Sequence, residues 1–200
     1  MAVEPSARPI PAEIASSWYR PISVAEYDQM IDANVFDEDD RLELLDGVVV
    51  RMSPQTSERA HVIAYLNELL VRALPARFQL RCQLPLTLAR SEPEPDFAVV
   101  DRRAALRAAR HPTTAVLVIE VAVDSLDKDR IKAATYAEAG VQEYWIVDVV
   151  HRRVDVWREP RRILRSYAEH AVIKRGSLTS EALSGIDVPI APMFRERRRR

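Results

Sequence analysis

One stretch of the sequence, Ala115-Val116-Leu117-Val118-Ile119-Glu120-Val121-Ala122-Val123, is the most apolar of the chain and carries a single acid near its centre. Its many β-branched residues, bounded by His111-Pro112 before and Asp124-Ser125 after, are typical of a strand buried on both faces. Removing an ionised carboxylate from water costs several kcal/mol even after relaxation, so Glu120 needs a metal ion, a cation or hydrogen bonds. The stretch therefore predicts a buried strand with a polar partner for its acid.

A second acid, Asp96, opens another apolar strand in the sequence Glu94-Pro95-Asp96-Phe97-Ala98-Val99-Val100. Two acids on neighbouring strands suggest a divalent metal site, because magnesium takes oxygen ligands and needs only one or two carboxylates beside water and substrate phosphate. A bound ion lowers the pKa of its water and offsets charge on a phosphoryl oxygen, as phosphodiester hydrolysis requires. Asp96 and Glu120 are therefore predicted ligands of Mg²⁺, with Mn²⁺ as an alternative. The hypothesis requires both side chains on one face of the sheet and neither held by a guanidinium.

A cationic side chain beside the ion would orient the attacking water or neutralise the transition state. Lys132 is the candidate, because it lies early in the helix expected over 129–139 and shares a face with Tyr136 one turn later. Each acid also has an ordinary interpretation: Glu120 could pair with a buried arginine, and Asp96 could be a turn aspartate. Lys132 could equally be solvated, as most helical lysines are. Only the combination favours a catalytic site.

Composition places few limits on the function of the chain. The chain has 200 residues, 48% of them hydrophobic, which is enough for one domain with short tails. The formal net charge of -1 gives no global attraction to nucleic acid, so a polyanion would need a local basic patch. The single Cys82 excludes an internal disulfide framework and a cysteine-rich zinc site. We expect a cytoplasmic protein without a secretory signal or a membrane-spanning segment.

Local patterns along the chain predict an α/β fold, with a central mixed β-sheet flanked by helices. Ser23 to Glu26 has capping-box spacing, and Asp46-Gly47 is a tight-turn signal between two strand-like runs. The strand of Glu120, the helix after it and the strand around Trp145 form a β-helix-β unit, so two neighbouring strands should run parallel. The expected elements are a helix over 23–30, a hairpin over 41–52, a helix over 57–74, strands over 78–88 and 96–100, a helix or loop over 102–110, and a hairpin of 144–148 with 154–157. The expected domains are a proline-containing flexible arm (1–20), one folded domain (21–194) and a basic tail (195–200).

Several motifs in the right order resemble the bacterial Uma-two family of restriction-endonuclease-like proteins, a branch of the PD-(D/E)XK nuclease superfamily. They are Glu94-Pro95-Asp96, Ile119-Glu120-Val121, Lys132 with Tyr136, and above all 140–148, and the resemblance extends over nearly all of residues 22–194. It implies a restriction-endonuclease-like core and metal-dependent cleavage of DNA, with Asp96 and Glu120 as metal ligands and Glu43 and His61 at the edge of the site.

The chain departs from the superfamily pattern at Ala122, which stands where the lysine of the Glu-x-Lys motif would be. Lys132 resembles the lysine that the family carries on the following helix, so the migrated role is assigned to it. Glu43 and His61 also have ordinary interpretations, as a water-facing strand residue and a lone helical histidine.

Two functions from different classes follow from these observations. The first is a metal-dependent endonuclease that acts on DNA, and a homodimer would suit the cutting of both strands. The second is a nuclease fold that has lost turnover and serves as a DNA-binding or protein-interaction module, which Ala122 favours. A sugar hydrolase built on two carboxylates is weaker, because the chain has few aromatic residues for stacking on sugars.

Overall fold

The structure is a computed structural model that describes residues 18–37 and 39–194. The predicted basic tail (195–200) and all but the last three residues of the predicted arm (1–20) lie outside this range, so both remain predictions. Within the described part, no helix is both long and apolar enough to cross a membrane.

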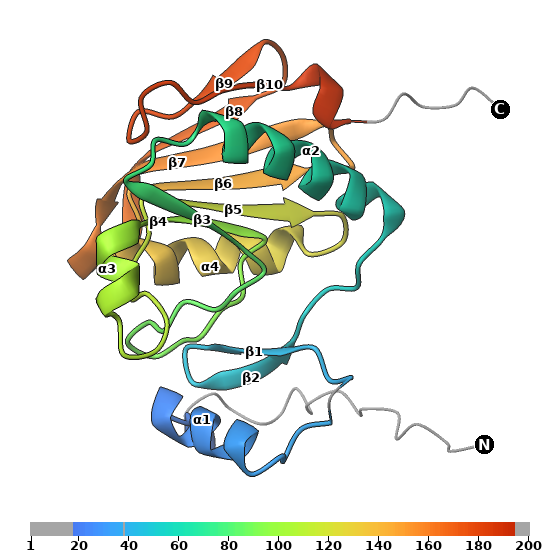
Figure 1. Cartoon of the computed structure of the whole chain (residues 1–200). Helices are drawn as coiled ribbons and strands as arrows, with labels where there is room; N and C mark the ends of the chain where they lie inside the picture. Colours follow the sequence, from blue (N-terminus) through green and yellow to red (C-terminus); the bar gives the residue numbers. More distant parts are fainter. Residues whose placement is uncertain (1–17, 38, 195–200) are drawn as a thin grey trace, which may run out of the picture.

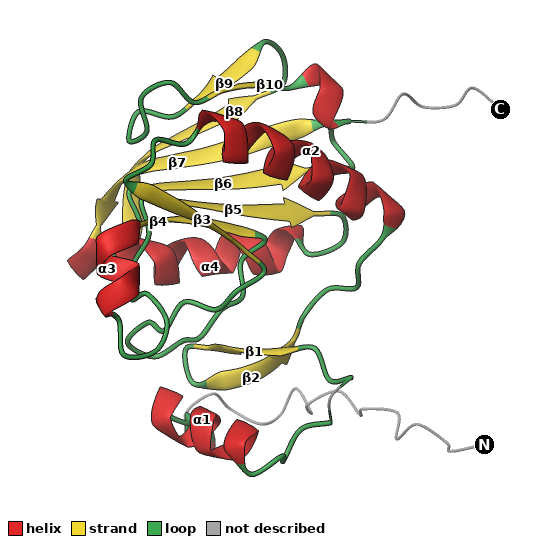
Figure 2. Cartoon of the chain, viewed as in Figure 1, coloured by secondary structure: helices red, strands yellow, loops and turns green. Residues whose placement is uncertain are grey.

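A six-stranded sheet in the order β3-β4-β5-β6-β7-β8 forms the centre of the molecule (Figures 1 and 2). Strands β5 and β6, which the crossover helix α4 connects, pair directly and run parallel, and all other neighbouring strands are antiparallel. The mixed sheet predicted from the sequence is therefore confirmed. The bounds are β3 (Phe78–Cys82), β4 (Phe97–Asp101), β5 (Leu117–Ala122), β6 (Glu143–Asp148), β7 (Arg153–Arg161) and β8 (Ser166–Ile173).

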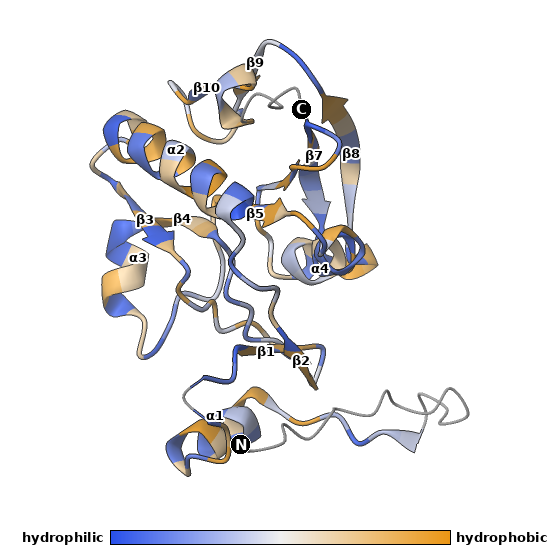
Figure 3. Cartoon of the chain, turned by 90° about the vertical axis from the view of Figure 1, so that its right-hand side faces the viewer, coloured by the Kyte–Doolittle hydropathy of each residue, from blue (hydrophilic) through white to orange (hydrophobic). Residues whose placement is uncertain are grey.

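Helices α2 (Ser57–Ala73) and α4 (Leu126–Glu138) cover opposite faces of the sheet, as Figure 3 shows in the view turned by 90°. Odd-numbered residues of β4 and β5, such as Ile119, pack with α2, and even-numbered residues, such as Val118, pack with Tyr136 of α4. Because side chains alternate along a strand, each strand contributes to two separate cores. Strand β5 is buried at all six positions, as its sequence predicted.

The N-terminal unit consists of α1 (Val24–Asp32) and the hairpin of β1 (Leu42–Leu45) and β2 (Val48–Arg51). Both capping-box hydrogen bonds predicted at the start of α1 are present. Asp46 and Gly47 turn the hairpin with φ angles of 47° and 82°, the positive pair that a two-residue turn of this type needs. An isolated bridge between Leu44 and Glu92 attaches β1 to the loop before β4, and this attachment carries Glu43 to the sheet.

Several elements differ from the predicted ones. Strand β3 ends at Cys82 and not at Leu88, and residues 102–110 form the short helix α3 (Arg102–Arg107) before a loop. Strand β8 was not predicted, because it is a largely exposed edge strand without an apolar face. The short β9 (Ser177–Thr179) and β10 (Asp187–Pro189), which lie on the side of α2, were missed because each is three residues long.

Candidate active site

Asp96 and Glu120 come from neighbouring segments of the sheet. The register of β4 with β5 ends at the pair of Phe97 and Ile119, and Asp96 directly precedes β4. The backbone N–H of Val121, the residue after Glu120, donates to Asp96 Oδ2 at 2.8 Å. Asp96 therefore lies beside the strand of Glu120, and the requirement that both side chains share one face of the sheet stays a prediction.

Lys132 joins Glu120 to Glu43 of the N-terminal hairpin. Its Nζ lies 2.9 Å from Glu120 Oε1 and 2.9 Å from Glu43 Oε2, and Tyr136 donates a second hydrogen bond to Glu120 Oε1 at 3.1 Å. Lys132 is only 3% exposed, so it is not the solvated helical lysine of the ordinary interpretation. The structure thus brings three of the predicted site residues, Glu43, Glu120 and Lys132, into direct contact.

Asp129, which the sequence analysis did not single out, completes the surroundings of Lys132. Its Oδ1 lies 4.0 Å from Lys132 Nζ, and Ser125 donates to its Oδ2 at 2.5 Å. Burial raises the pKa of Asp129 against the opposing influence of Lys132 and this hydrogen bond. Its place one turn before Lys132 on the same helix was the available signal, because residues three apart on a helix are neighbours.

Three carboxylates lie around the one ammonium group of Lys132, and burial raises the pKa of two of them, Glu120 and Asp129. Burial works against the charge of Lys132, but Glu120, Glu43 and Asp129 outweigh it and raise the pKa of the ammonium. Burial raises the pKa of Glu120 to about 8, because the attraction of Lys132 only partly compensates and the neighbouring acids Asp129, Asp96 and Glu43 add repulsion. The site therefore keeps a permanent cation and holds Glu120 as a carboxyl group that ionises near neutral pH.

Asp96 is held by a guanidinium, which contradicts the second requirement stated for the metal site. Nη2 of Arg59, in the first turn of α2, lies 2.9 Å from Asp96 Oδ1 and 3.0 Å from Oδ2. Burial opposes the charge of Arg59, but Asp96 outweighs it and raises the pKa of the guanidinium. The available signal was the position of Arg59, since a cation in the first turn of a helix is unfavourable next to the helix dipole unless an acid faces it.

His61 lies apart from the acids. It lines a hollow of about 240 Å³ with Val123 at the end of β5 and Phe194 near the end of the described chain, and none of the four site acids belongs to that lining. That His61 stands at the edge of the site remains a prediction.

The side chains present suit a hard dication that keeps most of its own water. The described residues contain no group of three or more histidine, cysteine or acidic side chains that could hold a metal ion by themselves. Magnesium does not need such a cage, because one or two carboxylates with water and phosphate complete its shell. Glu43 Oε1 is buried without a hydrogen bond among the described residues, although Lys128 lies 3.3 Å away. The oxygen donors of Glu43, Asp96 and Glu120 are of the kind that magnesium prefers, and Arg59 would have to leave Asp96 before an ion could bind there.

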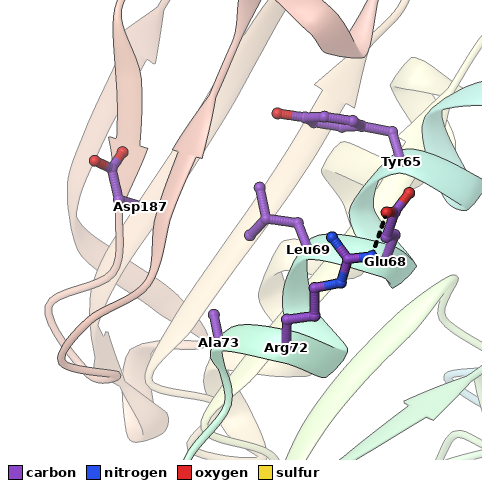
Figure 4. A pocket seen from close by; sticks show the side chains of 6 residues that line it. All are labelled: Tyr65, Glu68, Leu69, Arg72, Ala73 and Asp187. Atoms are coloured by element: carbon purple, nitrogen blue, oxygen red, sulfur yellow. Dashed lines mark ion pairs between the residues drawn. The ribbon is translucent and has the colours of Figure 1, made fainter.

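A separate pocket of about 450 Å³ lies between α2 and β10 (Figure 4). Its charged lining consists of Glu68 and Arg72, which form an ion pair at 2.8 Å, and of Asp187 across the gap. None of the predicted site residues lines it. The pocket is therefore not part of the acidic site.

Comparison with known proteins places the chain in a family. The profile of the Uma2 family, described as "Putative restriction endonuclease", matches residues 24–191. A crystal structure of a "putative nuclease belonging to DUF820" from Anabaena variabilis ATCC 29413 aligns with a TM-score of 0.68 and 16% identity, over 87% of this chain and 98% of that chain. At that identity it shows a shared fold.

The type IIG restriction endonuclease BpuSI aligns with a TM-score of 0.35 and 16% identity over 57% of this chain and 13% of that chain, which is too weak to carry an argument. No curated protein matches the chain. With a family profile that spans the hairpin of Glu43, the strands of Asp96 and Glu120 and the helix of Lys132, this chain belongs to the Uma2 family of restriction-endonuclease-like nucleases.

Proposed function

We propose that this protein is a magnesium-dependent endonuclease that hydrolyses phosphodiester bonds in DNA. The observation that carries the proposal is the position of Lys132 Nζ, 2.9 Å from both Glu120 and Glu43, with Asp96 close by, bonded to the backbone N–H of Val121. Membership of a family of restriction-endonuclease-like nucleases supports DNA as the substrate. Mn²⁺ has the same preference for oxygen ligands and would substitute for Mg²⁺.

In this proposal, Asp96 and Glu120 hold the ion, and the ion supplies Lewis acidity and a water of lowered pKa. Lys132 fixes the orientation of Glu120 and presents a permanent positive charge to the water or to the phosphate. Ala122 supports this role for Lys132, because it packs on the same face of the sheet as Glu120, the face that α4 covers. A lysine from α4 therefore approaches the place that a lysine at position 122 would occupy.

The acids and Lys132 are almost completely buried, whereas Lys128, at 26% side-chain exposure, reaches the surface beside them. Lys128 donates to the carbonyl of Arg51 in the hairpin at 3.0 Å and lies 3.3 Å from Glu43. A phosphate approaching the site would meet Lys128 first, and the side chains around Glu120 must rearrange before it reaches the acids.

The decisive experiment is nicking of supercoiled plasmid DNA by the purified full-length chain with Mg²⁺ or Mn²⁺. We expect conversion to the nicked form that stops in EDTA and is absent in Asp96→Asn, because the asparagine amide lacks the charge that a hard dication prefers. No cleavage of plasmid, linear duplex or single-stranded DNA with either metal would contradict the proposal.

A second candidate function, a catalytically inactive nuclease fold that binds DNA or a protein, is favoured by the contact of Arg59 with Asp96. If the guanidinium permanently replaces the metal, neither the wild type nor Asp96→Asn will bind Mn²⁺. Metal titration by calorimetry separates the two functions, since the endonuclease requires binding in the wild type that Asp96→Asn loses.

The pKa of Glu120, raised by burial to about 8, predicts the pH dependence of the site. Because the pKa of Glu120 is higher in the folded protein than in the unfolded chain, the folded state binds the proton more tightly. This contribution to stability is fully present below the unfolded-state pKa and is lost as the pH rises through the folded-state pKa of about 8. We expect the melting temperature of the metal-free protein to fall from about pH 6 to pH 9, and metal affinity to rise over the same range as Glu120 ionises. Glu120→Gln should flatten the first trend; an unchanged slope in this variant would contradict the assignment to Glu120.

A further inference from the structure

Arg59 binds Asp96 through only one of its guanidinium nitrogens. A guanidinium normally grips a carboxylate with two nitrogens, each donating to one oxygen. Here Nη2 alone contacts both oxygens of Asp96, at 2.9 and 3.0 Å. Nε of Arg59 is buried and has no hydrogen-bond partner among the residues that the structure describes. The guanidinium therefore keeps a donor for an acceptor that the described residues do not provide.

Arg59 also influences the other acids of the site. Besides Asp96, the charges of Glu120 and Asp129 raise its pKa, so the guanidinium lies within the electrostatic reach of both metal-binding acids of the proposed function. It is 6% exposed, whereas the arginines of the ordinary surface ion pairs, such as Arg72, are largely exposed. A dication and this guanidinium cannot both occupy the oxygens of Asp96, because their positive charges would repel in a buried site.

We propose that Arg59 is the internal counter-ion of Asp96, which competes with the divalent metal and binds a phosphate group of the substrate once the metal displaces it. This inference rests on the proposed function, because it needs a metal at Asp96. The partly satisfied guanidinium has the donors to bind a phosphate oxygen through Nε and one Nη. DNA and metal would then bind cooperatively, because each favours the same displaced position of Arg59.

The test measures Mn²⁺ binding to the metal-free protein, with and without a short mixed-sequence DNA duplex. The electron paramagnetic resonance signal of the free ion reports the binding. Arg59→Met keeps the length of the side chain and removes its charge. We expect it to bind Mn²⁺ at least about tenfold more tightly than the wild type without DNA, which corresponds to about 1.4 kcal/mol. DNA should tighten Mn²⁺ binding by the wild type and have a smaller effect on Arg59→Met. Without DNA, Arg59→Lys, which keeps a charge, should bind Mn²⁺ about as tightly as the wild type.

Arg158→Met is the matched control, because Arg158 also pairs with a buried acid: its Nε lies 3.4 Å from Oε1 of Glu143, which stands beside Leu117 at the start of β5 and not beside Glu120. Its Mn²⁺ affinity should equal that of the wild type. Asp96→Asn identifies the site, since it should lose the binding that Arg59→Met strengthens. If Arg59→Met loses too much stability to purify, the comparison of Arg59→Lys with the wild type in the presence of DNA still tests the proposal, because a lysine cannot offer the two-nitrogen grip on phosphate and should weaken the cooperativity.

The outcomes separate this inference from the function on which it rests. Equal or weaker Mn²⁺ binding by Arg59→Met, beside a wild type that binds and cuts, would overturn the competition and leave the endonuclease intact; Arg59 would then only position Asp96. Absence of Mn²⁺ binding in every variant, Arg59→Met included, would overturn both. Cooperativity with DNA that is unchanged in Arg59→Met would overturn the phosphate contact.

Discussion

Glu120→Gln is expected to lower metal-dependent DNA nicking by about 100-fold or more. The glutamine amide keeps the size of the side chain and can still accept the hydrogen bonds of Lys132 and Tyr136, which reach Glu120 Oε1 at 2.9 and 3.1 Å. It removes the negative charge that would hold the ion, and the loss of several kcal/mol of transition-state stabilisation corresponds to at least two orders of magnitude in rate. The rate of plasmid nicking at saturating Mg²⁺ measures the effect.

Asp124→Asn is the matched control for this variant. Asp124 is an exposed acid just beyond the end of β5, and nothing in the site depends on it. Its substitution should leave the nicking rate within about twofold, because an exposed charge contributes little. A melting temperature of Glu120→Gln near that of the wild type would show that the fold is intact. Nicking that persists at the wild-type rate in such a folded variant would exclude Glu120 from catalysis.

Lys132→Met is expected to cause the largest loss of stability, about 3–5 kcal/mol of unfolding free energy. Lys132 is buried with its Nζ 2.9 Å from both Glu43 and Glu120, so its removal leaves these buried acids without their cation. Methionine fills a similar volume, so the loss reports charge and not a cavity. Urea unfolding at neutral pH provides the measurement, and a loss below about 0.5 kcal/mol would contradict the buried charge cluster.

Two comparisons make this prediction specific. Lys128→Met removes a partly exposed cation 3.3 Å from Glu43 and should cost less than about 1 kcal/mol, because water screens that pair. Combining Lys132→Met with Glu43→Gln and Glu120→Gln should recover much of the stability, since replacing a whole buried charge cluster costs less than breaking it. A triple variant no more stable than Lys132→Met alone would show that the loss has another cause.

The sequence predicted the elements of the site better than their contacts. The strand of Glu120 and the Asp46-Gly47 turn follow from local patterns, and the structure confirms both. Placing Lys132 over Glu120 followed from the β-helix-β unit and from the helical spacing of Lys132 and Tyr136. Strand β8 was missed because an exposed edge strand lacks the alternation that marks a strand in sequence.

The contact of Asp96 with Arg59 is the main feature of the site that the sequence analysis did not assign. The sequence analysis expected a metal there, required that neither acid be held by a guanidinium, and named a buried arginine as the alternative partner of Glu120. In the structure Lys132, which was expected beside a bound ion, pairs directly with Glu120, and Asp96 is bound by the arginine. Residues 57–62 are mostly polar and look solvent-exposed in the sequence, so they do not mark Arg59 as the partner of Asp96. The one signal is that a cation in the first turn of a helix needs an acid nearby.

The sequence by itself determined where the strands and helices lie and that the acid in β5 would need a cation, because hydrophobic periodicity, turn residues and the cost of burying charge are local properties of the chain. Only the tertiary structure decided which cation faces which acid. Arg59 and Asp96 are 37 residues apart, and their contact depends on how the start of α2 meets the start of β4. Electrostatic attraction in a buried site acts over a few ångströms, so it follows the packing of the elements and not their order along the chain.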